Sequence, residues 1–168
     1  TTSSTASNMA KTLAYSRYFE IAEVPDVCVN TNVGDSFVYD SNKYYAVIDT
    51  NVIISSMLSV NPNSPTKEVI NNVWKDIITP MINAEIIEEY CDVLSRSKFH
   101  FKETDIKEML NLFRLKGEEY TPNCIRDEFT DLDDVIFYET YLMKEDSYLV
   151  TGNLKHFPSE PRILPPAD

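Results

Sequence analysis

Apolar and polar positions follow two different periods along this chain. Short apolar runs typical of buried strands alternate with stretches in which apolar residues recur every three or four positions, as on the buried face of a helix. Alternating strands and helices predict an α/β fold with a mainly parallel sheet and helices on both faces. The predicted strands are 44–49, 77–81, 119–122, 148–151 and 162–164, and the predicted helices are 51–59, 66–75, 83–95, 104–115 and 132–145.

Polar residues mark the predicted helix starts. Thr66, Asn83 and Thr104 are expected N-caps, because their side-chain oxygens can accept hydrogen bonds from the free N–H groups of the first turn. Pro80 is expected to weaken the second strand or end it early, because proline has no N–H to donate.

The first 43 residues differ from the rest. Residues 1–8 are almost entirely Thr, Ser, Ala and Asn, which predicts a flexible leader or a tag-derived remnant. Residues 9–43 are rich in aromatics and predict a short helix and two short strands. An arm packed on its own domain and a partner-binding arm both fit. We therefore predict an extension over 1–43 and a domain over 44–168.

Composition narrows the class of protein. The chain has 168 residues, of which 43% are hydrophobic, so one domain with a real core is expected. The net charge of −12 argues against a generic basic nucleic-acid binder. It is compatible with a nuclease whose bound cation is the largest local charge, and it suits a basic partner.

Cysteine usage and hydropathy indicate a compartment. Cys28, Cys91 and Cys124 are odd in number and widely spaced, so they form neither a disulfide framework nor a metal knuckle. Reduced thiols are expected, which is typical of the cytoplasm. No apolar run reaches the roughly 18 residues of a membrane span, and no signal peptide is visible. A cytoplasmic protein without membrane contact is the expectation.

Carboxylates stand near the ends of predicted elements. Asp49 follows the first strand, Glu89 lies at the edge of the apolar face of a helix, and Asn153 follows a later strand. Three further acids open the last helix: Asp131, Asp133 and Asp134. Acids gathered at strand ends are costly unless a cation lies among them, so a divalent-metal site is predicted there.

Each residue also has an ordinary interpretation. Asp49 could simply cap a helix, and Glu89 could lie on a solvated helix face. The acidic cluster could be a first-turn cluster that the helix dipole stabilises. Thr151 to Asn153 could be only a turn. Their order along the chain and their shared edge of the sheet favour the joint interpretation.

Four segments, in this order, carry a family resemblance: 46–52, 86–96, 131–134 and 148–158. Residues 44–164 resemble a PIN domain, in particular the PIN-family toxins of bacterial toxin–antitoxin systems. The resemblance implies a three-layer α/β/α fold and a metal-dependent ribonuclease. It implies metal-binding roles for Asp49, Glu89 and Asp134. The extension before Asp49 departs from the family pattern.

The resemblance also implies supporting roles. The family often has a fourth acid where Asn153 stands, so this site loses one negative charge. Asp131 and Asp133 would be neighbours of the metal ligands. Thr50 and Asn51 could orient Asp49 or a water molecule. Five further residues could contact the phosphate groups of a substrate: Thr151, Lys155, Arg96, Lys98 and Arg126.

The chemistry of the site follows from its donors. Carboxylate oxygens suit Mg²⁺ or Mn²⁺ rather than zinc. The chain has only two histidines, and we expect His156 to be a packing or turn residue rather than a ligand. The resemblance further implies an RNA substrate, an antitoxin protein and a homodimer.

Two alternatives stay open. One is a PIN-like module that binds RNA or protein and cleaves weakly or not at all, which the neutral Asn153 favours. The other is a different metal-dependent phosphoryl-transfer fold, such as a phosphatase or a receiver domain. A phosphatase of that kind would have a second Asp where Asn51 stands.

Overall fold

The computed structural model describes residues 43–121 and 132–168, without the side chains of residues 132 and 133. The elements predicted before residue 43 lie outside the described residues, as does Asp131. The description below concerns the described residues only.

Five parallel strands form one sheet in the order β3-β2-β1-β4-β5. Ile48 at the end of β1 pairs with Val150 at the end of β4, so the residues that follow these two strands emerge side by side. The strands are β1 (Tyr44–Ile48), β2 (Ile78–Ile82), β3 (Glu118–Glu119), β4 (Ser147–Val150) and β5 (Ile163–Leu164).

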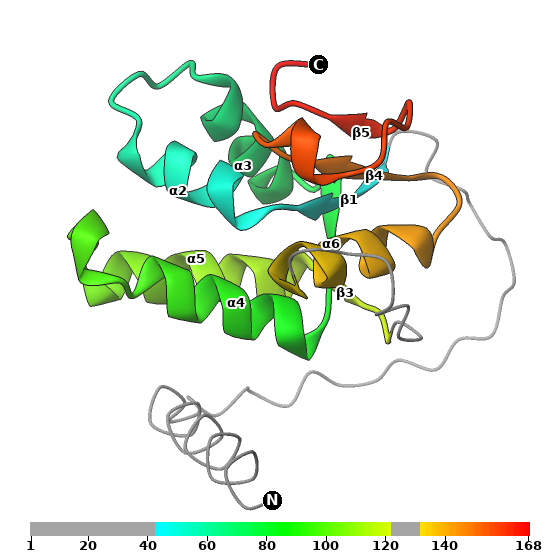
Figure 1. The fold of residues 1–168 in the computed structure, drawn as a ribbon. Helices are drawn as coiled ribbons and strands as arrows, with labels where there is room; N and C mark the ends of the chain where they lie inside the picture. Colours follow the sequence, from blue (N-terminus) through cyan, green and yellow to red (C-terminus); the bar gives the residue numbers. More distant parts are fainter. Residues whose placement is uncertain (1–42, 122–131) are drawn as a thin grey trace, which may run out of the picture. The chain divides into compact units, whose positions relative to one another are not determined.

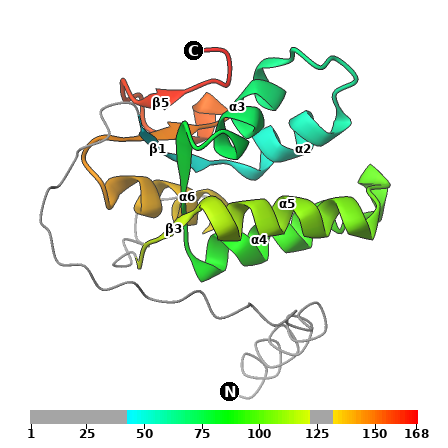
Figure 2. The same cartoon turned by 180° about the vertical axis from the view of Figure 1, so that it is seen from behind.

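Helices cover both faces of the sheet, α2 and α3 on one side and α4, α5 and α6 on the other (Figures 1 and 2). The predicted three-layer α/β/α fold is confirmed. Across the described parts of the chain, no helix is long and apolar enough to cross a membrane. The helices are α2 (Thr50–Leu58), α3 (Pro65–Trp74), α4 (Ala84–Leu94), α5 (Glu103–Lys116) and α6 (Leu132–Leu142), with the 3₁₀ turns η1 (Ser97–Phe99) and η2 (Leu154–His156).

The core lies between the sheet and the helices. Val47 and Leu149 of the central strands are fully buried, as expected for a parallel sheet covered on both faces. Tyr90 of α4 is also fully buried, packs edge-on against Phe113 with ring centroids 5.0 Å apart, and donates a hydrogen bond from its hydroxyl to the carbonyl oxygen of Ile48. Tyr90 therefore ties α4 to the carboxyl end of β1.

Of the three predicted N-caps, Asn83 is confirmed, whereas Thr66 and Thr104 are wrong. Asn83 caps α4, accepting from the N–H of Ile86 at 2.8 Å. The N-cap of α3 is Ser64 rather than Thr66, because Pro65 is well suited to the first helical position. Helix α5 starts after Lys102 rather than at Thr104, and acidic residues in its first turn favour this start in place of a side-chain cap.

Pro80 does not end the second strand. It lies inside β2, pairs with Ala46 of β1, and the strand continues to Ile82. The neighbouring β3 pairs only with Met81 and Ile82, so β2 has a single paired neighbour at Pro80. The missing N–H of a proline is tolerated where one side of the strand is unpaired.

Candidate active site

Asp49 follows β1 directly and caps α2. Its backbone is extended, and its Oδ1 accepts a hydrogen bond from the N–H of Asn51 at 3.1 Å. The residue is only 6% exposed. The capping interpretation is therefore correct, and the same geometry holds a buried carboxylate at the edge of the sheet where ligands bind in such folds.

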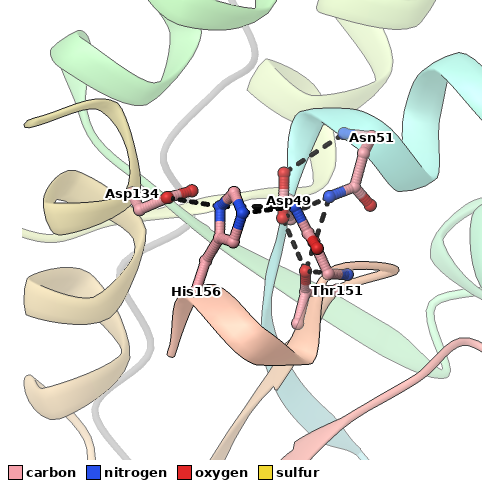
Figure 3. Close-up of polar contacts among 6 residues, drawn as sticks. Asp49, Asn51, Asp134, Thr151 and His156 are labelled. Carbon is pink, nitrogen blue, oxygen red and sulfur yellow. Dashed lines mark hydrogen bonds and ion pairs between the residues drawn. The ribbon is translucent and has the colours of Figure 1, made fainter. Parts of the chain in front are cut away.

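Two side chains from different elements fix the other oxygen of Asp49 (Figure 3). Its Oδ2 accepts from the Thr151 hydroxyl at 2.6 Å and from the Asn51 amide at 2.5 Å. Asn51 Oδ1 in turn accepts from the N–H of Gly152 at 2.8 Å. A Cβ at Gly152 would lie 3.0 Å from Asn51 Oδ1, so a side chain there would disturb this contact.

Asp134 reaches the same edge of the sheet from the first turn of α6. Its side chain is 18% exposed, and its Oδ2 lies 2.8 Å from Nδ1 of His156. The Asn153 amide nitrogen lies 2.9 Å from His156 Nε2, and the Asn153 N–H donates to the Thr151 hydroxyl at 2.9 Å. Figure 3 shows the His156 ring between Asp134 and the group around Asp49. A continuous set of polar contacts thus joins the two acids.

The electrostatics of the site favour a cation. Burial raises the pKa of the Asp49 carboxyl, and the Asp134 carboxylate raises this pKa further. Hydrogen bonds from Thr151 and Asn51 lower the pKa and offset part of this effect. A positive charge near Asp49 would favour its ionised form and so offset the effects of burial and of the second carboxylate.

The residues present fit a hard divalent ion that uses few protein ligands. Among residues 43–121 and 132–168, no three His, Cys, Asp or Glu side chains are close enough together to hold a metal. Mg²⁺ usually binds through one or two carboxylates and keeps several waters. Asp49 and Asp134 supply such a pair.

The structure does not gather all of the predicted ligands. Glu89 lies half-buried on α4, at the edge of the apolar face as predicted, but it does not complete a three-ligand group with Asp49 and Asp134. Its role as a ligand stays a prediction. The structure describes neither Asp131 nor the side chain of Asp133.

Thr50 makes no hydrogen bond to Asp49, and its role in orienting a water molecule stays a prediction. Its hydroxyl is buried and has no hydrogen-bond partner within the described part of the chain. A buried, unpaired hydroxyl is costly and often marks a place where a water or ligand binds.

The sequence interpretation missed one residue of the site. His156 lies in the 3₁₀ turn η2, as expected, but its contact with Asp134 was not predicted. The available signal was its place three residues after Asn153 on a short helical turn, which brings the two side chains onto one side.

The chain was compared with known proteins. Residues 45–155, more than half of the chain, match the family model of the PIN domain. The matched range includes Asp49, Asp134 and Asn153, and it ends just before His156. The comparison with curated proteins gave no match. The chain therefore belongs to the PIN domain family, whose members are typically nucleases that use divalent metals.

Proposed function

We propose that this protein is a ribonuclease that hydrolyses RNA phosphodiester bonds with Mg²⁺ or Mn²⁺. The observation that carries the proposal is that Asp49 and Asp134, far apart in the sequence, lie at the same edge of the sheet and are joined through Thr151, Asn153 and His156. Membership in a family of nucleases supports the same reaction class.

The side chains of the site have separate tasks. Asp49 and Asp134 would hold the cation, and Glu89 is proposed as a further ligand. A bound cation would activate water and stabilise the charge that develops on phosphate. Thr151 and Asn51 hold Asp49 by hydrogen bonds, so the carboxylate is oriented before a cation arrives. Thr50 is proposed to orient a water molecule, because its buried hydroxyl has no hydrogen-bond partner within the described residues.

A basic and aromatic turn supports RNA as the substrate. Residues 96–102, between α4 and α5, contain three Lys or Arg and no acid in a chain of net charge −12. The rings of Phe99 and Phe101 stack with centroids 5.6 Å apart, and Lys98 lies over Phe99 at 4.8 Å. Cations combined with aromatic rings are typical of single-stranded nucleic-acid binding.

We further propose that the enzyme is the toxin of a toxin–antitoxin pair and acts as a homodimer in the cytoplasm. The support is the resemblance of segments 46–52, 86–96, 131–134 and 148–158 to such toxins. An antitoxin with a basic surface would complement the acidic chain.

A second function has its own support. Asn153 is neutral where the family often has an acid, and the described residues contain no three-ligand metal group. Both observations favour a PIN domain with weakened catalysis that binds RNA or protein.

Isosteric substitutions separate the two functions. Asp49→Asn and Asp134→Asn should each abolish Mg²⁺- or Mn²⁺-dependent cleavage of single-stranded RNA while the chain stays folded, because each removes a carboxylate from the cation site. The matched control is Asp146→Asn, which removes the same charge from an exposed turn between α6 and β4 and should leave cleavage unchanged. Equal cleavage by wild type and both site variants would refute the nuclease assignment. RNA binding without cleavage in the wild type would favour the second function.

A further inference from the structure

His156 connects Asn153 to Asp134. Its Nδ1 lies 2.8 Å from Asp134 Oδ2, and its Nε2 lies 2.9 Å from the amide nitrogen of Asn153. The Asn153 amide nitrogen is also 3.2 Å from Nδ1. These side chains come from α6 and from the turn after β4, so the imidazole joins two separate parts of the site (Figure 3).

The direction of the hydrogen bond between His156 and Asp134 follows from the chemistry of the two groups. An ionised carboxylate only accepts, so His156 Nδ1 must carry a hydrogen and donate it to Asp134. His156 therefore donates to Asp134. The Asn153 amide nitrogen lies close to both ring nitrogens, so it contacts the face of the imidazole and helps to hold the ring in place.

A hydrogen bond of this kind sets the direction of a carboxylate. Asp134 is mostly covered, whereas the His156 ring is about half exposed. The hydrogen bond from His156 restrains Oδ2 of Asp134. Carboxylates that bind metals are usually held by such hydrogen bonds, and losing one weakens metal binding by about 10- to 100-fold.

We propose that His156 is a positioning residue that holds Asp134 for the cation, and that Asn153 acts through His156 rather than as a metal ligand. This inference rests on the proposed metal-dependent function. It explains how a neutral residue can serve at the position where the family often has an acid. It also agrees with the finding that Asp49, Asp134 and His156 do not form a three-ligand group in the described parts of the chain.

Substitution of His156 by asparagine or by glutamine shows which of the two imidazole nitrogens is needed. The amide of His156→Asn can take the place of Nδ1 and donate to Asp134, whereas the longer His156→Gln reaches toward the place of Nε2. We expect His156→Ala and His156→Gln to weaken Mn²⁺ binding by about 10- to 100-fold. His156→Asn should bind Mn²⁺ nearly as tightly as wild type. Titration of the full chain followed by the signal of free Mn²⁺ measures these affinities.

Asn153 provides an independent arm of the test. Asn153→Ala should weaken Mn²⁺ binding, and the double variant with His156→Ala should bind no more weakly than His156→Ala alone, because both substitutions break one path. Additive losses would show that Asn153 acts on the metal by itself and would overturn the inference.

Controls separate the possible failures. His100→Asn changes the only other histidine, which is exposed and has a positive φ that asparagine tolerates, and should leave Mn²⁺ affinity unchanged. Equal affinities for wild type and His156→Ala would overturn the inference alone, as would equal affinities for the asparagine and glutamine variants. If the wild type binds no Mn²⁺ and cleaves no RNA, both this inference and the proposed function fail.

Discussion

Two buried threonines beside Asp49 differ in the partners of their hydroxyls. The Thr151 hydroxyl donates to Asp49 and accepts from the N–H of Asn153. The Thr50 hydroxyl has no partner within the described residues. A paired buried hydroxyl stabilises the fold, whereas an unpaired one costs free energy. The same substitution should therefore have different effects at the two positions.

We expect Thr151→Val to lower the free energy of unfolding by about 1–3 kcal/mol, because the Asp49 carboxylate and the Asn153 N–H each lose a partner. Thr50→Val should leave this free energy unchanged or raise it slightly. Thr151→Ser keeps the hydroxyl and should stay closer to wild type. Urea unfolding at neutral pH measures all three variants. Similar losses for the two valine variants would contradict the hydrogen bonds described for Thr151.

The proximity of two site residues was predictable where their positions at the ends of strands determine where they lie. Asp49 and Thr151 both follow strands, and parallel strands bring their carboxyl ends to one edge, so their proximity follows from topology. The contact between His156 and Asp134 was not predictable in this way. It depends on how η2 lies relative to α6, which is decided by tertiary packing and leaves no local signature.

Two tyrosines attach helix α6 to Glu160, which lies in the segment before β5. The hydroxyl of Tyr138 donates to Glu160 Oε1 at 2.6 Å, and that of Tyr141 donates to Oε2 at 2.8 Å. These hydrogen bonds lower the pKa of Glu160. Burial, and then the hydrogen bond to Glu160, raise the pKa of Tyr138 to about 12. Because α6 also carries Asp134, this attachment supports the site.

The Glu160 attachment should weaken in acid. Its pKa is lower in the folded state than in the unfolded state, so its contribution is complete above the unfolded pKa and is lost as the pH falls through the folded pKa. We expect Glu160→Gln to lower the free energy of unfolding by about 1 kcal/mol at neutral pH. The difference from wild type should shrink in acid, below the ordinary pKa of glutamate. Urea unfolding at both pH values tests this, and an unchanged difference would count against the ionised hydrogen bonds.

Element boundaries were predictable where local chemistry is unambiguous. Asn83 was identified as a cap because few neighbouring residues compete with it. Ser64 was missed because Thr66 also caps well and only the position of Pro65 decides between them. The continuation of β2 through Pro80 could not be predicted, because it depends on how little of β2 pairs with β3.

The architecture of the domain was largely contained in the order of its segments. Alternating strands and helices leave few arrangements other than a parallel sheet between helical layers, and the structure has that arrangement. The division at residue 44 stays a prediction. Which acids approach one another depends on side-chain directions. Within the described residues, Asp49 and Asp134 are joined through intervening side chains, and Glu89 does not complete a three-ligand group with them.

A cation held by Asp49 and Asp134 at this edge of the sheet is the basis of the proposed activity. The most direct test is a Mn²⁺ titration of the full chain and of Asp49→Asn, Asp134→Asn and the control Asp146→Asn, followed by the signal of free Mn²⁺. We expect the wild type and the control to bind with the same affinity and each site variant to bind at least about 10-fold more weakly. Equal binding by all four proteins, or no binding by the wild type, would contradict a cation site at this edge of the sheet.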